Sequence, residues 1–369
     1  MKHQELQNNM KKKLLIIFSA ILLLLIVSVI GVVIYYNNSI DSSVSKDDTN
    51  VTFIVEKGSS SKIVVDKLYD SNLIKNKYVG YVYFKLNSDI VLQAGVYDLN
   101  RSMSFEEIIE AISSGKVVDN SISVTFIEGK RLLNYVDVIS STFGYSKDDI
   151  LNKLSDEKYL KELINKYWFL TDDILNDKIY YPLEGYLSPN TYFFEKDASI
   201  ETIIEKMLDT TGITLDKYKD DIGNSKYSVH EMITMASIVE LEGTSSSDRK
   251  GVAGVWYNRL SSGGTLGSDV TSYYGVNKPF SEELSFKDLE NCNPYNTSDR
   301  NVCAFSGLPV GPIASPSVDS LVASFEPEEH DYYFFVADKY GKTYFTETYA
   351  AHVEIINKLK SEGLWYTYE

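Results

Sequence analysis

A stretch of about 22 residues without one charged side chain, from Leu14 to Tyr35, constrains the fold of this chain more than any other feature. A helix of that length spans the hydrocarbon core of a bilayer. Lysines precede the stretch and none follows closely, which predicts a cytoplasmic N-terminus and an extracellular remainder. A cleaved signal would have a shorter apolar region and a small-residue cleavage site. We therefore predict a retained, single-pass anchor in the cell membrane over residues 14–36, with residues 1–13 in the cytoplasm.

Three further segments follow the predicted anchor. Residues 37–50 are rich in Ser, Asn and Asp without a hydrophobic period, which is typical of a flexible linker. Residues 51–120 alternate short strand patterns with helical patterns, one of them capped by Ser102 or Ser104, and this predicts a small α+β module. Residues 121–369 continue as a mixed domain with a C-terminal hairpin. The predicted fold class is α+β.

The composition excludes several classes of function. The formal net charge of −16 argues against a nucleic-acid partner, because phosphate binding relies on clustered Lys and Arg, and against adhesion of the outer part to anionic lipid. The 4 histidines are scattered, so no zinc site of the usual spacing can be assembled, and no glycine-rich nucleotide loop is present. We expect no metal and no cofactor. The chemistry then rests on carboxyl and hydroxyl groups.

The 2 cysteines, Cys292 and Cys303, fall in one predicted extracellular loop. A disulfide between them fits an oxidising compartment and would contribute about 2–3 kcal/mol of stability. Two free buried thiols are the alternative, and the sequence leaves both open.

Glu240 is the strongest candidate for chemistry. It ends an apolar helical run whose start has the capping-box spacing of Ser228 and Glu231. With Val239 and Leu241 beside it, burial would raise the pKa of its carboxyl group, and the negative end of the helix dipole would act in the same direction. Such a carboxyl group can serve as a general acid. The alternative is an ordinary solvated glutamate near a helix end.

Several separated segments, in order and type, resemble the MltG (YceG-like) family of membrane-bound endolytic murein transglycosylases. They are Leu183–Phe194, Ser237–Glu240, Gly251–Leu260, Leu266–Gly275, Tyr295–Thr297 and Ser306–Pro316. The resemblance runs from the anchor, Leu14–Tyr36, to the C-terminus. It implies a lyase that acts on the glycan strands of peptidoglycan and a LysM-like module over residues 51–120. Peptidoglycan synthases are a further candidate partner.

The same resemblance assigns roles to residues. It makes Glu240 the catalytic residue, and it implies substrate contacts for Glu184, Tyr192, Asn258, Arg259, Ser268, Asp269, Tyr295 and Asn296. From the residues alone, Asp269 could equally cap a turn and Glu184 a helix entry. The chain departs from the family at Gly267, where glutamine is usual, at Leu241, where lysine is common, and at Ser188, where phenylalanine is usual. The missing glutamine amide puts one substrate hydrogen bond in doubt.

One carboxyl group suffices if the substrate supplies the nucleophile. Glu240 and Glu242 cannot form the carboxyl pair of an ordinary glycosidase, because residues two apart on a helix point to different faces. In a lytic transglycosylase the 6-hydroxyl of N-acetylmuramic acid attacks its own C1 and leaves a 1,6-anhydro end. A hydrolase that uses Asp269 to activate water, and a catalytically silent wall-binding scaffold, are the alternatives.

Overall fold

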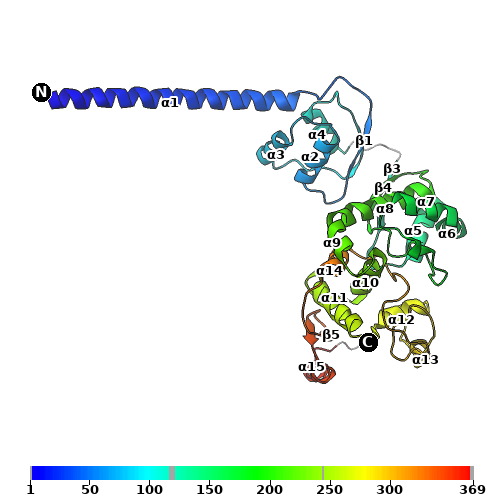
Figure 1. The fold of residues 1–369 in the computed structure, drawn as a ribbon. Coiled ribbons are helices and arrows are strands. Elements are labelled where there is room, and N and C mark those ends of the chain that lie inside the picture. The colour runs from blue at the N-terminus through cyan, green and yellow to red at the C-terminus, as the bar shows by residue number, and fades with distance from the viewer. Residues whose placement is uncertain (1, 116–120, 243–244, 366–369) are drawn as a thin grey trace. The chain divides into compact units, whose positions relative to one another are not determined.

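The computed structural model describes residues 2–115, 121–242 and 245–365. Its contacts divide the chain into an N-terminal unit, Met1–Ser123, and a C-terminal unit, Val124–Glu369. Both units contain helices and short antiparallel or two-stranded sheets, which agrees with the predicted mixture of helix and strand (Figure 1).

The chain begins with a long helix, α1 (Lys2–Asp41). Within its part from Ile21 to Asp41, a window of 18 residues has a mean hydropathy of 2.2 and no buried residue, so this part is long and apolar enough to cross a membrane. The exposed large side chains of this part run on to Tyr35, which is 57% exposed.

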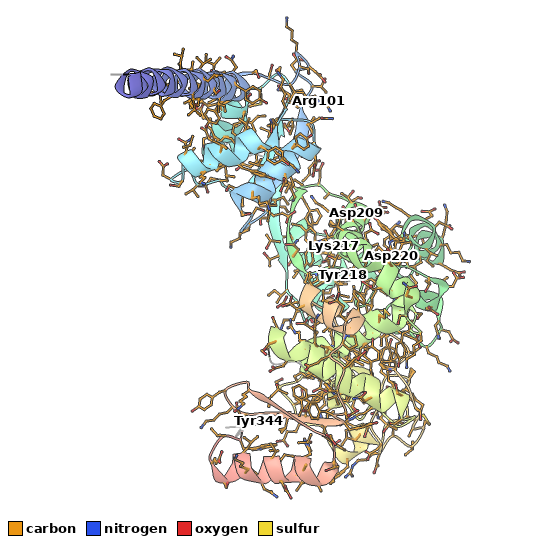
Figure 2. All side chains as sticks on the ribbon, turned by 60° about the vertical axis from the view of Figure 1, so that its left-hand side comes forward. Arg101, Asp209, Lys217, Tyr218, Asp220 and Tyr344 are labelled. Atoms are coloured by element: carbon orange, nitrogen blue, oxygen red, sulfur yellow. A yellow bond between two sulfur atoms is a disulfide. The ribbon has the colours of Figure 1, made fainter. Side chains whose placement is uncertain are left out.

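The prediction of a flexible linker over residues 37–50 is wrong for its first part. Residues 37–41 are helical, and Ile40 packs with Tyr36 against the core of the N-terminal unit. Further on, Asp47 pairs with Arg101, labelled in Figure 2, at 3.2 Å. No Gly or Pro stands between Tyr36 and Asp41 to end the helix there, and the i, i+4 pair of Tyr36 and Ile40 gives this part an apolar face.

The N-terminal unit is a small layered module. Its strands β1 (Val51–Val55) and β2 (Gly95–Leu99) pair antiparallel, and β1 lies opposite β2 from end to end. Helices α2 (Ser61–Asp70) and α3 (Lys77–Leu86) connect them, and α4 (Phe105–Ser113) follows. Apolar side chains of all five elements form one buried cluster.

The C-terminal unit holds the remaining elements. In chain order they are β3 (Ser121–Phe126, which begins just before the division), α5 (Leu132–Phe143), α6 (Lys147–Leu154), α7 (Glu157–Lys166), η1 (Asp172–Leu175), β4 (Asn190–Glu195), α8 (Ile200–Leu215), η2 (Asp216–Tyr218), α9 (Lys219–Asn224), α10 (Val229–Glu242), α11 (Ser246–Ser261), α12 (Asp269–Gly275), α13 (Phe286–Leu289), α14 (Val318–Phe325), β5 (Phe334–Ala337), β6 (Thr343–Thr346) and α15 (Tyr349–Ser361). Strands β3 and β4 form one two-stranded sheet, and β5 and β6 form the predicted C-terminal hairpin.

Serine caps begin several of these helices, because a hydroxyl oxygen satisfies an amide that the first turn leaves unpaired. Ser104, not Ser102, caps α4, and it forms a complete capping box with Glu107. Ser228 and Glu231 exchange the same two hydrogen bonds at the start of α10, at 3.2 and 2.7 Å, as predicted.

Helix α10 is the central helix of the C-terminal unit. All its residues except Glu231 and the last three are buried, so the helix is packed on every face along most of its length. The cause is that α11, α12 and α14 all pack against it. Met235, Ile238 and Val239 join Val252 and Trp256 of α11 in one core cluster. A helix that is buried on all sides holds the residue at its end in a fixed place.

Candidate active site

The carboxyl group of Glu240 lies where α10 meets the start of α14. Its side chain is only 5% exposed. The Oε2 atom accepts from the amide of Ser317 at 2.9 Å, from the hydroxyl of Ser317 at 2.6 Å and from the hydroxyl of Ser320 at 2.7 Å. The Oε1 atom accepts from Nη2 of Arg249 at 3.2 Å. Four donors therefore converge on one carboxyl group.

These contacts correct the apolar environment that the neighbouring residues predict for Glu240. Ile238 and Val239 are buried, but they point into the core of the unit. The carboxyl group itself meets hydroxyl, amide and guanidinium groups. Side chains that are adjacent along a helix point in different directions, so apolar sequence neighbours say little about what a carboxyl group at the helix end will touch.

Arg249 is a member of the site that the sequence analysis missed. It lies on α11, and its side chain is 12% exposed. Its Nη1 atom donates to the hydroxyl of Ser317 at 2.9 Å and lies 3.8 Å from Oδ2 of Asp319. Since Ser317 accepts from Arg249, its own hydroxyl proton is directed to Glu240. Ser317 is the residue directly after the family-like segment Ser306–Pro316, so that segment ends one residue before a member of the site.

The backbone of Gly129 lies beside the other side of Glu240. A Cβ atom on Gly129 would sit 3.8 Å from Cγ and 3.9 Å from Oε1 of Glu240. Gly129 has a φ of +70°, in the left-handed region that favours glycine. It also lines a hollow of about 310 Å³ together with Arg131, Asn277 and Phe280. The oxygen of Glu240 that has a single donor is therefore the one nearer to Gly129, which lines this hollow.

The walls of the hollow carry polar and aromatic groups. Arg131 donates to Asn277 at 3.2 Å and to the carbonyl of Lys278 at 2.9 Å, and its guanidinium group lies over the rings of Tyr274 and Phe280. Phe280 is half exposed. Sugars are held by hydrogen bonds and by aromatic faces, and this hollow offers both.

Glu242 belongs to a different cluster from Glu240. Its Oε1 atom accepts from the hydroxyl of Ser268 at 2.6 Å, and burial, with a smaller effect of Asp269, raises its pKa. Asp269 is the first residue of α12 and is exposed, and partial desolvation together with Asp299 raises its pKa. Glu240 and Glu242 thus have separate partners, as their spacing predicts.

Glu184 supports two helices from inside the protein. It is 1% exposed, and both its carboxyl oxygens accept from the amide of Leu132, the first residue of α5, at 2.9 and 3.0 Å. Oε2 also accepts from the hydroxyl of Tyr274 at 3.1 Å. Burial raises the pKa of Glu184 to about 7. This geometry matches the helix-entry cap that the sequence left open.

Three more predicted substrate contacts are buried and occupied. Tyr192 is 5% exposed and donates to the carbonyl of Ser188 at 2.7 Å. Tyr295 is fully buried, and its ring lies against Tyr274. The side-chain amide of Asn296 donates to the backbone carbonyls of Leu289 and Asn291, at 2.9 and 2.8 Å. These side chains hold loops and strands in place behind the site.

Asn258 and Arg259 bind backbone rather than carboxylates. The Nδ2 atom of Asn258 donates to the carbonyls of His330 and Tyr332 at 2.7 and 2.9 Å. Arg259 donates to the carbonyls of Tyr333 and Leu266, and its guanidinium group stacks over Trp256. Within the part of the chain that the structure describes, no ion pair joins Arg259 to Asp269 or Glu242. Burial lowers the pKa of Arg259, and the charge of Glu242 offsets part of that effect.

The loop after α11 explains one departure from the family pattern. Gly267 has a φ of +65°, and its amide donates to the carbonyl of Thr297 at 2.9 Å. A side chain at this position would be strained.

Of the two alternatives for the cysteines, the structure has the disulfide between Cys292 and Cys303.

Comparison with known proteins places this geometry in a family. The YceG-like family matches residues 53–358. The endolytic murein transglycosylase of Bacillus subtilis (strain 168) is 35% identical over 322 residues, which is 86% of this chain and 86% of that protein. The endolytic murein transglycosylase of Streptococcus pneumoniae serotype 2 is 31% identical over 319 residues, and the match covers 82% of this chain but 57% of the streptococcal protein.

A solved structure agrees with the sequence matches. The crystal structure of a yceG-like protein from Listeria monocytogenes has a TM-score of 0.59 and 36% sequence identity, and the match covers 83% of this chain and 99% of that one. The resemblance drawn from the separated motifs is thereby confirmed. The chain belongs to the YceG-like family.

Proposed function

We propose that this protein is a membrane-anchored endolytic lytic transglycosylase that cleaves the β-1,4 bond between N-acetylmuramic acid and N-acetylglucosamine in nascent peptidoglycan. The products would be 1,6-anhydro-N-acetylmuramic acid ends, and the cleavage would limit the length of glycan strands. The observation that carries the proposal is the setting of Glu240, a carboxyl group held by four donors beside a hollow. The relatives named endolytic murein transglycosylase support the general activity.

The hydrogen bonds suggest a division of labour between the two oxygens of Glu240. Oε2 accepts from three donors, so it is held in place and has little capacity left. Oε1 has one protein donor and lies nearest to Gly129. We assign proton transfer to Oε1. It would give a proton to the leaving glycosidic oxygen and take one from the 6-hydroxyl of the muramic acid residue, so that one group serves as acid and base.

Arg249 has a positioning role in this scheme. Its guanidinium group contacts both Glu240 and Ser317, so it fixes the carboxyl group and the hydroxyl that donates to it. Attack by a hydroxyl of the same sugar gains from proximity, because the nucleophile and the reacting carbon already belong to one molecule. The protein therefore has to orient the sugar and move protons, and it needs no second carboxyl group.

The hollow lined by Gly129, Arg131, Asn277 and Phe280 is our candidate for the site of one sugar residue of the glycan. Its volume of about 310 Å³ and its half-exposed aromatic ring support that use. In the N-terminal unit, the resemblance implies a LysM-like module with affinity for peptidoglycan, and the compact core of that unit supports a separately folded binding module.

The predicted anchor would place the enzyme at the cell membrane, with a cytoplasmic N-terminus and an extracellular C-terminal unit. The apolar and exposed part of α1 supports an anchor. Glycan strands are the proposed substrate and peptidoglycan synthases remain a candidate partner.

Mass spectrometry of muropeptides released from purified sacculi tests the proposal. Wild-type protein should release anhydro products and Glu240→Gln should release none, while Glu242→Gln, two residues away with a different partner, should keep the anhydro products. Reducing ends in place of anhydro ends would favour a hydrolase that uses Asp269. No cleavage by folded wild-type protein would favour the silent scaffold.

A further inference from the structure

Helix α3 of the N-terminal unit exposes an apolar stripe. Tyr78, Val82 and Leu86 follow one another at intervals of four residues, so they share one face of the helix. Their exposed fractions are 68%, 46% and 68%. The neighbouring face of α3 packs into the unit, because Val79 and Tyr83 are buried. Large apolar side chains gathered on one exposed face mark a surface that meets another apolar phase.

This stripe lies beside the place where α1 joins the unit. Asn76, the N-cap of α3, donates from Nδ2 to the hydroxyl of Tyr35 at 3.1 Å. Lys75 donates to the hydroxyl of Ser42 at 3.3 Å. Helices α1 and α3 are in contact, and Figure 1 shows α3 on the side of the unit that lies back along α1. Since Tyr35 ends the exposed apolar run, α3 begins at the level where a membrane span would end.

The charge around the stripe is opposite in sign to the charge of the whole chain. Residues 61–86 contain five lysines and two aspartates, a local net charge of +3, whereas the chain carries −16. Lys62, Lys75 and Lys85 are exposed. Lysines that flank an exposed apolar stripe are what an anionic lipid surface attracts. The net charge of the chain had argued against such adhesion, but that argument averages over residues far from α3.

We propose that α3 lies in the headgroup layer of the outer leaflet, with Val82 and Leu86 at the acyl boundary and the flanking lysines among anionic headgroups. The ring of Tyr78 suits this depth, because tyrosines favour the interface between hydrocarbon and water. The proposal rests on the membrane anchor of the proposed function. Its consequence is that the N-terminal unit has a fixed face against the bilayer and does not swing on a flexible tether.

Shallow quenching of a fluorescent label tests this contact. Full-length protein is reconstituted in vesicles of phosphatidylethanolamine and phosphatidylglycerol, with a thiol-reactive environment-sensitive dye on single cysteines introduced by Val82→Cys or Leu86→Cys. The native disulfide leaves no other thiol to label. Asp98→Cys, exposed on β2, is the matched control, and Val27→Cys within α1 reports the anchor itself. Lipids brominated near the headgroup serve as the quencher for the labels outside α1, and lipids brominated deep in the acyl chains serve as the quencher for the label at Val27.

We expect the labels at Val82 and Leu86 to be quenched at least threefold more than the label at Asp98, and the difference to shrink in vesicles of phosphatidylcholine alone. Equal quenching at all three positions, with strong quenching at Val27, would overturn the proposal and leave the anchor intact. Absence of quenching at Val27 would remove the anchor and this inference together. A change in dye fluorescence at Val82 and Leu86 that depends on the density of protein in the vesicle, and not on the lipid, would indicate contact with a second copy. A change that appears only after glycan fragments are added would indicate a sugar site. Either result overturns the proposal.

Discussion

The buried carboxyl group of Glu184 gives a stability prediction with a defined sign. Burial raises its pKa from 4.5 to about 7 in the folded protein. Between those two values the folded state binds a proton that the unfolded state has released. The free energy of unfolding therefore falls as the pH rises, which is the reverse of what a carboxylate in a stabilising ion pair would give.

The magnitude follows from the size of the rise. One pKa unit corresponds to about 1.4 kcal/mol, so the rise at Glu184 lowers the free energy of unfolding by about 3 kcal/mol between about pH 4 and pH 8. Because the side chain is 1% exposed, solvent screening does not reduce this figure much. Glu184→Gln removes the ionisation. Its side-chain NH₂ group cannot accept from the amide of Leu132, so the variant should lose about 1–3 kcal/mol in its free energy of unfolding at every pH. The pH dependence, and not the absolute stability, is the diagnostic quantity.

Urea unfolding followed by tryptophan fluorescence measures this difference. All 3 tryptophans, Trp168, Trp256 and Trp365, belong to the C-terminal unit, so the signal reports the unit that contains Glu184. The stability of Glu184→Gln relative to wild type should rise by about 3 kcal/mol from low to high pH. Glu195→Gln, at the exposed end of β4, controls for the loss of a carboxyl group and should keep the wild-type profile. Parallel profiles for wild type and Glu184→Gln would refute the reasoning.

Three further predictions concern the site and its supports. Arg249→Ala should reduce the rate of glycan cleavage by at least tenfold with little change in substrate affinity, because Glu240 loses a donor that orients it. Arg249→Lys should restore part of the rate. Steady-state kinetics on sacculi measure both quantities, and a loss of affinity with an unchanged rate would contradict the positioning role. Arg259→Ala should lower the free energy of unfolding by about 3 kcal/mol through two lost backbone contacts, and an unchanged melting temperature would point to direct substrate contact. Replacing Cys292 and Cys303 by serine opens a loop with a sequence separation of 11 and should cost about 3 kcal/mol, which a reductant titration of the wild type should reproduce.

Local signals were sufficient to predict much of the fold. A serine cap acts on an amide two or three residues away, so the starts of α4 and α10 could be located from Ser104 and Ser228. The hairpin β5–β6 follows equally from alternation around a turn. The prediction of a flexible linker from residue 37 was wrong because the polar composition of residues 37–50 outweighed a single apolar pair, Tyr36 and Ile40.

The surroundings of the candidate site could not be predicted in the same way. The donors to Glu240 come from Ser317 and Ser320, which lie 77 and 80 residues further along the chain. No periodicity carries information over that distance. Arg259 has guanidinium geometry suited to a carboxylate, yet it binds carbonyl groups whose position depends on the path of two loops. Motif order pointed to Glu240 as the candidate catalytic residue, and only packing reveals what holds its carboxyl group.

The separation between Glu240 and its serine partners also has a meaning in time. A ribosome adds about 5–20 residues per second. The 77 residues from Glu240 to Ser317 therefore represent about 4–15 s during which a growing chain contains Glu240 without the serine donors that hold its Oε2 atom. Helix α14 must be made before the carboxyl group can take up its geometry. An unfinished chain is thus expected to be unable to cut glycan, and the enzyme would become active only when its last third has been synthesised and packed against α10.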